Sequence, residues 1–223
     1  MRIPRGPRFR PWTPMVRGNP GAPACVADSA GKVGDVVIAL IDETSPTGPG
    51  GIYYVVSAAV VLDQGTLAGP LRSIFGSGRT KPFHWVTEGS AVLDRMVRLI
   101  CEGGVVTHVT VHYPTGRRRQ EEARGLALSE LVPLVVAEGV TDLIIESRSE
   151  REDGRDRGTL IEITRELVDE LDYRWEPKTE PLLWIADAIC GSVKQYLLGE
   201  DAGPFERLRA AGVIGDLRYR HLP

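Results

Sequence analysis

The sequence predicts a mixed α/β protein, and three observations support that class. Residues 36–44 (VVIALIDET) form an apolar run that is too short for an independent helix and rich in β-branched residues, which is typical of a central strand covered on both faces. A second apolar run, at 52–62, follows a Gly- and Pro-rich turn and pairs most simply antiparallel with the first. Helical and strand patterns then alternate, which indicates parallel neighbours with helices covering the sheet.

Length and composition are those of a soluble globular protein with one substantial core. The chain has 223 residues, of which 42% are hydrophobic and 26% charged. It contains neither an apolar run long enough to span a bilayer nor the apolar region of a secretory signal, so we expect a cytoplasmic protein without membrane contacts. Three widely separated cysteines, Cys25, Cys101 and Cys190, indicate neither a disulfide framework nor a zinc site.

Residues 1–33 are expected to be a disordered basic arm rich in Pro, Arg and Gly, followed by a single domain at 34–223. Residues 1–27 carry five arginines and no acidic residue, so the net charge of −3 becomes −8 for the rest of the chain. Such an arm can tether nucleic acid, but an unstructured extension is the simpler interpretation, with Met15 as an alternative start. The acidic body argues against broad, charge-driven affinity for nucleic acid and leaves room for a local basic strip.

Hydrophobic periodicity predicts the other elements, which together make a mixed five-stranded sheet with helices on both faces. Helices are expected at 89–104, 117–137, 159–171 and 181–198, and further strands at 105–113 and 141–147. Residues 63–82 are Gly-rich and irregular, with room for a short edge strand. The tail after 198 is expected to be a short helix plus coil. Alternation along 105–113 puts His108 and His112 on one face of the sheet.

Three carboxylates end or interrupt apolar runs, and they predict the functional site. Asp42 ends the first strand, Glu146 follows the run DLII, and Asp187 lies inside LLWIADAIC. A carboxylate in such a place is costly unless it is paired, hydrogen-bonded or bound to a cation. Three of them converging from separate elements favour a hard divalent cation. Adjacent strand residues point to opposite faces, so only one of Asp42 and Glu43 can be a direct ligand without a bulge, and we choose Asp42.

Each acid also has a structural interpretation. Asp42 and Glu43 could simply open the turn at 44–51. Glu146 could pair with Arg148, two residues further along the same strand face. Asp187 is the hardest to explain in this way, because it borders the buried face of its helix, where an unpaired acid costs several kcal/mol.

Other polar residues have weaker patterns. His84, with Glu88 four residues later, could be a general acid or a metal ligand, and a structural histidine is at least as well supported. The ESRSEREDGRDR segment at 146–157 is dense in both charges and is expected to be a solvated loop. The run Arg117, Arg118 and Arg119 is usually a solvated helix face, yet it is also the best group in the body of the chain for holding a phosphate backbone.

The element order, with acids on the first strand, a later strand and the final helix, is the arrangement expected of a ribonuclease H-like fold. The chain also resembles the DUF3800 domain proteins, an uncharacterised family regarded as ribonuclease H-like. The resemblance is carried by four stretches: IDET at 41–44, FHWVTE at 83–88, ESRSERED at 146–153 and LLWIADAI at 182–189. It implies an acidic cluster of Asp42, Glu146 and Asp187, with Glu43, His84, Arg148 and Asp153 nearby. Thr44 and Pro82 depart from the family pattern, and Pro82 stands where many members have an acid before the position of His84.

The function predicted on this basis is phosphodiester hydrolysis by a metal-dependent nuclease with two Mg²⁺ or Mn²⁺ ions about 4 Å apart. The predicted metal ligands are Asp42, Glu146 and Asp187; Glu43 and His84 are further catalytic residues; Arg148, Arg117, Arg118 and Arg119 bind substrate; Glu88 and Asp153 are secondary candidates. If Glu146 lay too far from the other two acids, His112 or Glu88 would complete the cluster.

Two alternatives remain open on sequence. One is a phosphohydrolase of small phosphate esters on the same fold, and the other is a non-catalytic binding module of a defence or toxin system. The sequence has no phosphate-binding loop, dinucleotide fingerprint, nucleophile elbow or zinc-protease motif. An NTPase, a dehydrogenase and a serine hydrolase are therefore disfavoured.

Overall fold

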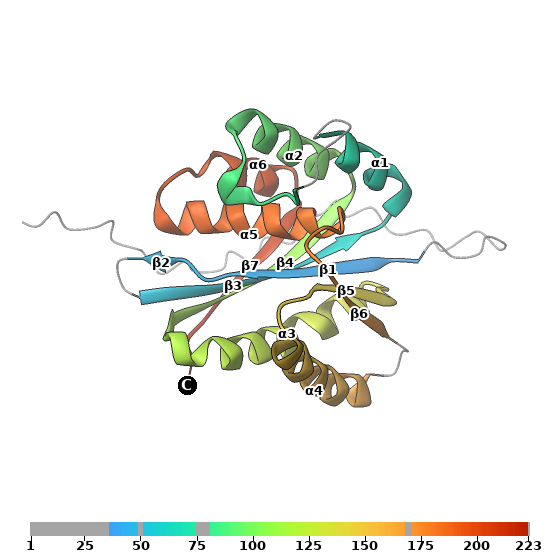
Figure 1. The fold of residues 1–223 in the computed structure, drawn as a ribbon, viewed down its shortest axis with the longest axis vertical. Coiled ribbons are helices and arrows are strands. Elements are labelled where there is room, and N and C mark those ends of the chain that lie inside the picture. The colour runs from blue at the N-terminus through green and yellow to red at the C-terminus, as the bar shows by residue number, and fades with distance from the viewer. Residues whose placement is uncertain (1–35, 49–50, 75–80, 168–170, 223) are drawn as a thin grey trace, which may run out of the picture. The chain divides into compact units, whose positions relative to one another are not determined.

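A mixed sheet with helices on both faces forms the body of the protein in a computed structural model that describes residues 36–48, 51–74, 81–167 and 171–222 (Figure 1). Within these residues the strands are β1 (Ile38–Thr44), β2 (Thr47–Gly48), β3 (Gly51–Val61), β4 (Val105–Thr115), β5 (Asp142–Glu146), β6 (Asp172–Glu176) and β7 (Ile214–Arg220). Their order is β6-β5-β1-β3-β4-β7, with β2 paired to β3. The predicted arm at 1–33 lies outside the described residues.

Strand directions follow the predicted ribonuclease H-like arrangement. β1, β3 and β4 are consecutive antiparallel neighbours, and β5 then lies parallel to β1 on its other side, with β6 parallel to β5. The carboxyl ends of β1, β4, β5 and β6 therefore share one edge of the sheet. The fold class predicted from the sequence is confirmed.

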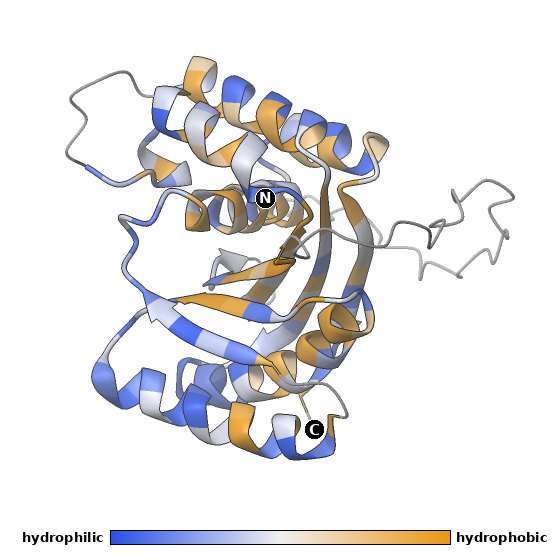
Figure 2. Ribbon diagram, turned by 90° about the vertical axis from the view of Figure 1, so that its right-hand side faces the viewer, coloured by the Kyte–Doolittle hydropathy of each residue, from blue (hydrophilic) through white to orange (hydrophobic). Residues whose placement is uncertain are grey.

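Helices cover the two faces unequally (Figure 1). One face carries α1 (Gln64–Ile74), α2 (Ser90–Glu102), α5 (Leu183–Leu198) and α6 (Gly203–Ala210), and the other carries α3 (Gln120–Ala137) and α4 (Glu150–Glu166). Each face has its own core, and adjacent residues of β1 serve different ones: Leu40 packs under α5, whereas Ile41 packs under α3. Hydrophobic residues concentrate in the inner strands of the sheet and on the helix faces turned toward them (Figure 2).

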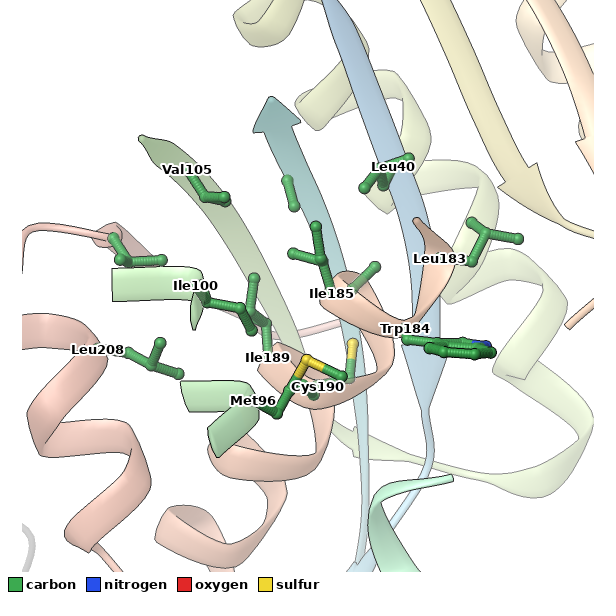
Figure 3. Packing of buried hydrophobic residues seen from close by; sticks show 14 of the residues in the cluster. Leu40, Met96, Ile100, Val105, Leu183, Trp184, Ile185, Ile189, Cys190 and Leu208 are labelled. Carbon is green, nitrogen blue, oxygen red and sulfur yellow. The ribbon is translucent and has the colours of Figure 1, made fainter. Parts of the chain in front are cut away.

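Helix α5 is the central helix of the larger core, because its residues from Leu183 to Val193 are all buried. Figure 3 shows Ile185 and Ile189 of this helix among Leu40 of β1, Ile100 of α2 and Leu208 of α6, all of them in one cluster. Such burial explains why its sequence lacks a polar face. In the described part of the chain, no helix has the length and apolar character needed to cross a membrane.

Some predicted elements were wrong. Residues 64–74 form α1 and no edge strand, because Asp63 accepts hydrogen bonds from the first amides of the helix and Leu67, Leu71 and Ile74 recur on one buried face. The charged segment after Glu146 is the start of α4, capped by Ser149, and not a solvated loop.

Three strands were not predicted, namely β2, β6 and β7. β2 lies in the segment that the sequence predicts to be a turn. β6 and β7 lie at the two edges of the sheet and carry mainly polar side chains, so neither produces an apolar run. The tail contains α6 followed by β7 in place of a helix plus coil. The sheet has seven strands in the described residues, because the predicted edge strand is replaced by α1 and three strands are added.

Candidate acidic site

Asp42, Glu146 and Asp187 converge at the carboxyl edge of the sheet. Ile41 of β1 pairs with Ile145 of β5 in parallel register, so the residues that follow them, Asp42 and Glu146, lie side by side at that edge. Asp187 is in the first turns of α5, which packs on β1. The three carboxylates are close enough that Glu146 and Asp187 both raise the pKa of Asp42.

Lys178 places its ammonium group among these carboxylates. Its Nζ lies 3.2 Å from Glu146 Oε1 and 3.8 Å from Asp187 Oδ1. Burial opposes the charged lysine, but the negative charges of Asp42, Asp187 and Glu146 outweigh it and raise the pKa of Lys178 above its usual value. Lys178 is thus the cation that partly neutralises the cluster.

Asp42 is the most buried member of the cluster, with 3% of its surface exposed. Burial is the largest cause that raises its pKa well above the usual aspartate value, followed by the charges of Glu146, Glu43 and Asp187, while Lys178 lowers it. Asp42 Oδ1 accepts the Glu43 amide at 2.7 Å. Within the described residues, the buried Oδ2 of Asp42 and Oε2 of Glu146 have no hydrogen-bond partner.

These two oxygens test whether the residues suit a divalent cation. Buried carboxylate oxygens without a partner are the type of ligand that Mg²⁺ and Mn²⁺ prefer. The donor set therefore fits such an ion. In the side-chain positions of the described residues, however, no three His, Cys, Asp or Glu residues are grouped as metal ligands, and the ammonium of Lys178 lies among the acids instead.

Asp187 also fixes the segment that carries His84. Its Oδ2 accepts the backbone amide of Trp85 at 2.8 Å, and its Oδ1 lies 3.5 Å from His84 Nδ1. The Trp85 ring packs so closely on α5 that a Cβ at Gly191 would come within 2.1 Å of Trp85 Cγ. His84 is thereby held beside the acids with its side chain about half exposed (48%).

Glu43 lies on the opposite face of β1 from Asp42, as strand alternation predicts. It pairs with Arg124, which is fully buried, and lies 3.6 Å from Arg148. Arg124 and Arg148 both bind the buried Asp156, at 2.8 and 3.1 Å. The pKa of Glu43 is raised above its usual value, because burial outweighs the opposing charges of Arg124 and Arg148. We call these four residues, Glu43, Arg124, Arg148 and Asp156, the arginine network.

The other predicted site residues have different surroundings. Arg148 makes ion pairs in the arginine network and with Glu121, so the alternative pairing of Glu146 with Arg148 is not found. Strand β5 ends at Glu146, and the same-face alternation on which that pairing depends ends there too. Asp153 accepts from Ser147 Oγ and the Arg148 amide, so it shapes the loop before α4.

Arg117, Arg118 and Arg119 form the short helix η2 (Arg117–Arg119) after β4. The carboxyl end of β4 points in the same direction as those of β1 and β5, and β4 extends beyond Val109, which is level with Asp42. Arg117 and Arg118 are exposed, and Arg119 pairs with Glu122 at 2.7 Å. Glu88 follows the short helix η1 (Trp85–Thr87) and is half-buried. His112 is buried on the α3 face of β4, across the sheet from α5, and its pKa is lowered mainly by burial.

Sequence reasoning missed Lys178, Arg124 and Asp156. Lys178 lies in the turn between β6 and α5, where no periodic pattern marks a side chain as buried. Arg124 did carry a signal, because it lies four and seven residues before Leu128 and Leu131 on the buried face of α3. A charged residue on a buried helix face is the same pattern that identified Asp187.

Comparison with known proteins adds little to this geometry. No family model and no curated protein matches the chain, so the resemblance to DUF3800 proteins rests on the four motifs alone. Among solved structures, a chain in the PCNA:RNase HII complex from Archaeoglobus fulgidus is 15% identical, with a TM-score of 0.47 over 78% of this chain and 77% of that chain. This likeness is too distant to bear on activity, and the fold class rests on strand order and direction.

Proposed function

We propose that this chain is a metal-dependent phosphodiester hydrolase that acts on nucleic acid, with Asp42, Glu146 and Asp187 as the ligands of Mg²⁺ or Mn²⁺. The observation that carries the proposal is the convergence of three carboxylates from β1, β5 and α5, two of which have a buried oxygen without a partner in the described residues. Without a cation of higher charge, this arrangement retains strong repulsion among its acids.

The protein residues supply position and charge. A bound divalent ion would supply an activated water and would stabilise the charge that develops on the phosphate. Asp42 is fixed by the Glu43 amide, and Asp187 is fixed by the Trp85 amide, so two of the acids are already oriented. Orientation of ligands before binding lowers the entropy lost when substrate and ion assemble.

His84 has the exposure and position of a group that moves protons between the site and solvent. Its ring is about half exposed, and Nδ1 lies 3.5 Å from Asp187 Oδ1. An imidazole so placed can donate a proton to a leaving oxygen. We assign His84 this role and keep Glu43 as a support for β1, because its carboxylate is held by Arg124 on the other face.

Arg117 and Arg118 are the proposed contacts to the phosphate backbone. They are exposed after the carboxyl end of β4, which points in the same direction as the strand ends that carry Asp42 and Glu146. Arg148 is less suited, because its guanidinium is held by Glu43, Glu121 and Asp156. A nucleic acid crossing this edge would meet arginines at one end and the acids at the other.

One observation favours the second candidate, a non-catalytic binding module. Lys178 already places a positive charge among the three acids, and a cluster neutralised in this way can be a purely structural feature. A small-ester phosphohydrolase would use the same acids without the arginines. Dependence of cleavage on substrate length separates it from a nuclease.

The test is a cleavage assay on single- and double-stranded DNA, RNA and an RNA–DNA hybrid with Mn²⁺, Mg²⁺ or chelator. We expect metal-dependent cleavage that D42N and D187N each reduce by at least about 100-fold. The matched control is D94N, since Asp94 pairs with Arg207 on the outer helices. Cleavage that survives in D42N and D187N, or its absence with every substrate, would reject the proposed nuclease.

A further inference from the structure

Lys178 occupies a position for which the proposed function has no use. Its ammonium is within 4 Å of two of the three acids, and it is the cation that lowers the pKa of the third, Asp42. Like charges repel at such distances, and a divalent ion that bound these acids would experience Lys178 as a competitor. If the carboxylate oxygens bound the metal while the ammonium stayed beside them, the two positive charges would repel each other.

In the turn that carries Lys178, the backbone is held in place and the side chain is held less firmly. The backbone is anchored, because the indole nitrogen of Trp184 donates to the Lys178 carbonyl at 3.0 Å and the Glu180 amide donates to the Pro177 carbonyl at 2.9 Å. The side chain is one-third exposed. A lysine has a flexible four-carbon stem, so its ammonium can swing into water while the turn stays in place.

Resting on the proposed function, we propose that Lys178 is an internal counter-ion that exchanges with the divalent cation: the ammonium neutralises the acidic cluster in the metal-free protein and leaves it when the metal binds. The exchange keeps a positive charge beside the buried carboxylates in both states, with only partial compensation in the metal-free protein. It also sets a threshold for metal binding, because the ion must displace a charge that is already present.

Two features support exchange over a fixed lysine. Lys178 contacts Glu146 and Asp187 through one oxygen each, at 3.2 and 3.8 Å, and its ammonium is a point charge on a flexible stem. The buried Arg124 in the arginine network, in contrast, has only 1% of its side chain exposed and binds both oxygens of Asp156. The protein therefore holds a permanent cation on one face of β1 and a releasable one on the other.

The experiment is calorimetric titration of MnCl₂ into chelator-treated protein, with wild type, K178Q and K194Q compared. Lys194 lies on α5 and is half-buried, so K194Q removes an equal charge away from the acids. We expect K178Q to bind Mn²⁺ at least about tenfold more tightly than wild type, and K194Q to bind like wild type. Binding by K178Q that is equal to wild type or weaker would overturn the exchange.

A second measurement, of melting temperature, tests whether K178Q changes the stability of the fold. Without metal, K178Q leaves the acids uncompensated, so its melting temperature should fall below that of wild type in chelator and recover in Mn²⁺ by a larger increment than wild type shows. The K178R variant, which keeps the charge, should retain affinity near that of wild type. Equal increments for K178Q and wild type would contradict exchange.

The outcomes separate this proposal from the nuclease. Tighter Mn²⁺ binding by K178Q together with no cleavage of any nucleic acid would reject the nuclease and leave the exchange supported. Cleavage by wild type with unchanged Mn²⁺ affinity in K178Q would reject only the exchange. If neither wild type nor K178Q bound Mn²⁺, the exchange would be rejected, and the cleavage assay alone would decide on the nuclease.

Discussion

Asp42 and Glu43 are neighbours on β1, yet they belong to two charged clusters on opposite faces of the sheet. Asp42 faces α5 together with Glu146, Asp187 and Lys178, and Glu43 faces α3 and pairs with Arg124. The first cluster has more negative than positive charge around a buried acid. In the second, each buried charge has a partner. Replacing Asp42 or Glu43 by the neutral amide should therefore have different effects on the stability of the protein.

The first prediction concerns the stability of the metal-free protein. E43Q should lower the free energy of unfolding by about 2 kcal/mol, because it removes an ionic partner of the buried Arg124. D42N should leave it unchanged or raise it, because it removes an acid that its neighbours disfavour. Urea unfolding in chelator measures both. A larger loss in D42N than in E43Q would show that the clusters are assigned the wrong way round.

The second prediction follows from the raised pKa of Asp42. The folded protein binds the Asp42 proton more tightly than the unfolded chain, whose aspartate has the ordinary value near 3.8, so the contribution of this group to stability is greatest at low pH. It decreases as the pH rises above that value and through the raised pKa. In chelator, wild type should therefore lose stability relative to D42N as the pH is increased.

Unfolding of both proteins at a series of pH values, with metal excluded, checks this. The difference between D42N and wild type should widen with rising pH and level off once Asp42 is ionised in the fold. Saturating Mn²⁺ should reduce the difference or reverse it, since the ion stabilises the ionised acid. A difference that stays constant with pH in chelator would contradict the assigned burial of Asp42.

Part of this site could be predicted from the sequence because it depends on periodicity. Alternation along β1 separates Asp42 from Glu43, and the helical period places Asp187 at the buried face of α5. The convergence with Glu146 required only that β1 and β5 be parallel neighbours. The antiparallel pairing of β1 with β3 was predicted from the turn between them, whereas the antiparallel pairing of β4 with β3 and the order of the strands were not.

The features that could not be predicted leave no periodic pattern in the sequence. Lys178 reaches the acids from a turn, and a turn residue gives no signal about the direction of its side chain. The polar strands β6 and β7 were not predicted, because a strand at the edge of a sheet does not need an apolar run of residues. The start of α4 was mistaken for a loop because several of its charges are satisfied by partners distant in sequence, such as Asp156 with Arg124.

The third prediction tests how Gly191 positions His84. A methyl group at this position would come within 2.1 Å of the Trp85 ring, so G191A should push Trp85 and the adjacent His84 away from α5. We expect a loss of about 2 kcal/mol in stability and a change in tryptophan fluorescence. G158A is the control, since a Cβ there meets open space on helix α4 and should raise stability by about 0.5–1 kcal/mol. Unchanged fluorescence in G191A would refute the close packing.

The last prediction concerns Arg117 and Arg118. The double variant R117Q/R118Q should weaken binding of nucleic acid without changing Mn²⁺ affinity. These arginines are exposed beyond the carboxyl end of β4, and in the described residues they have no contact with the acids. Binding by wild type should weaken with salt, and the slope of log affinity against log salt should fall by about one for each lost phosphate contact.

Fluorescence anisotropy with a labelled oligonucleotide at several salt concentrations measures this, in D187N protein so that the probe stays intact. The matched control is R165Q, because Arg165 is exposed at the far end of α4, which begins at the carboxyl edge of β5 and ends away from it. A reduced slope in R117Q/R118Q but not in R165Q would assign the backbone contact to η2. Equal slopes in all three proteins would place the nucleic acid elsewhere and favour a small phosphate ester as the substrate of the acidic cluster.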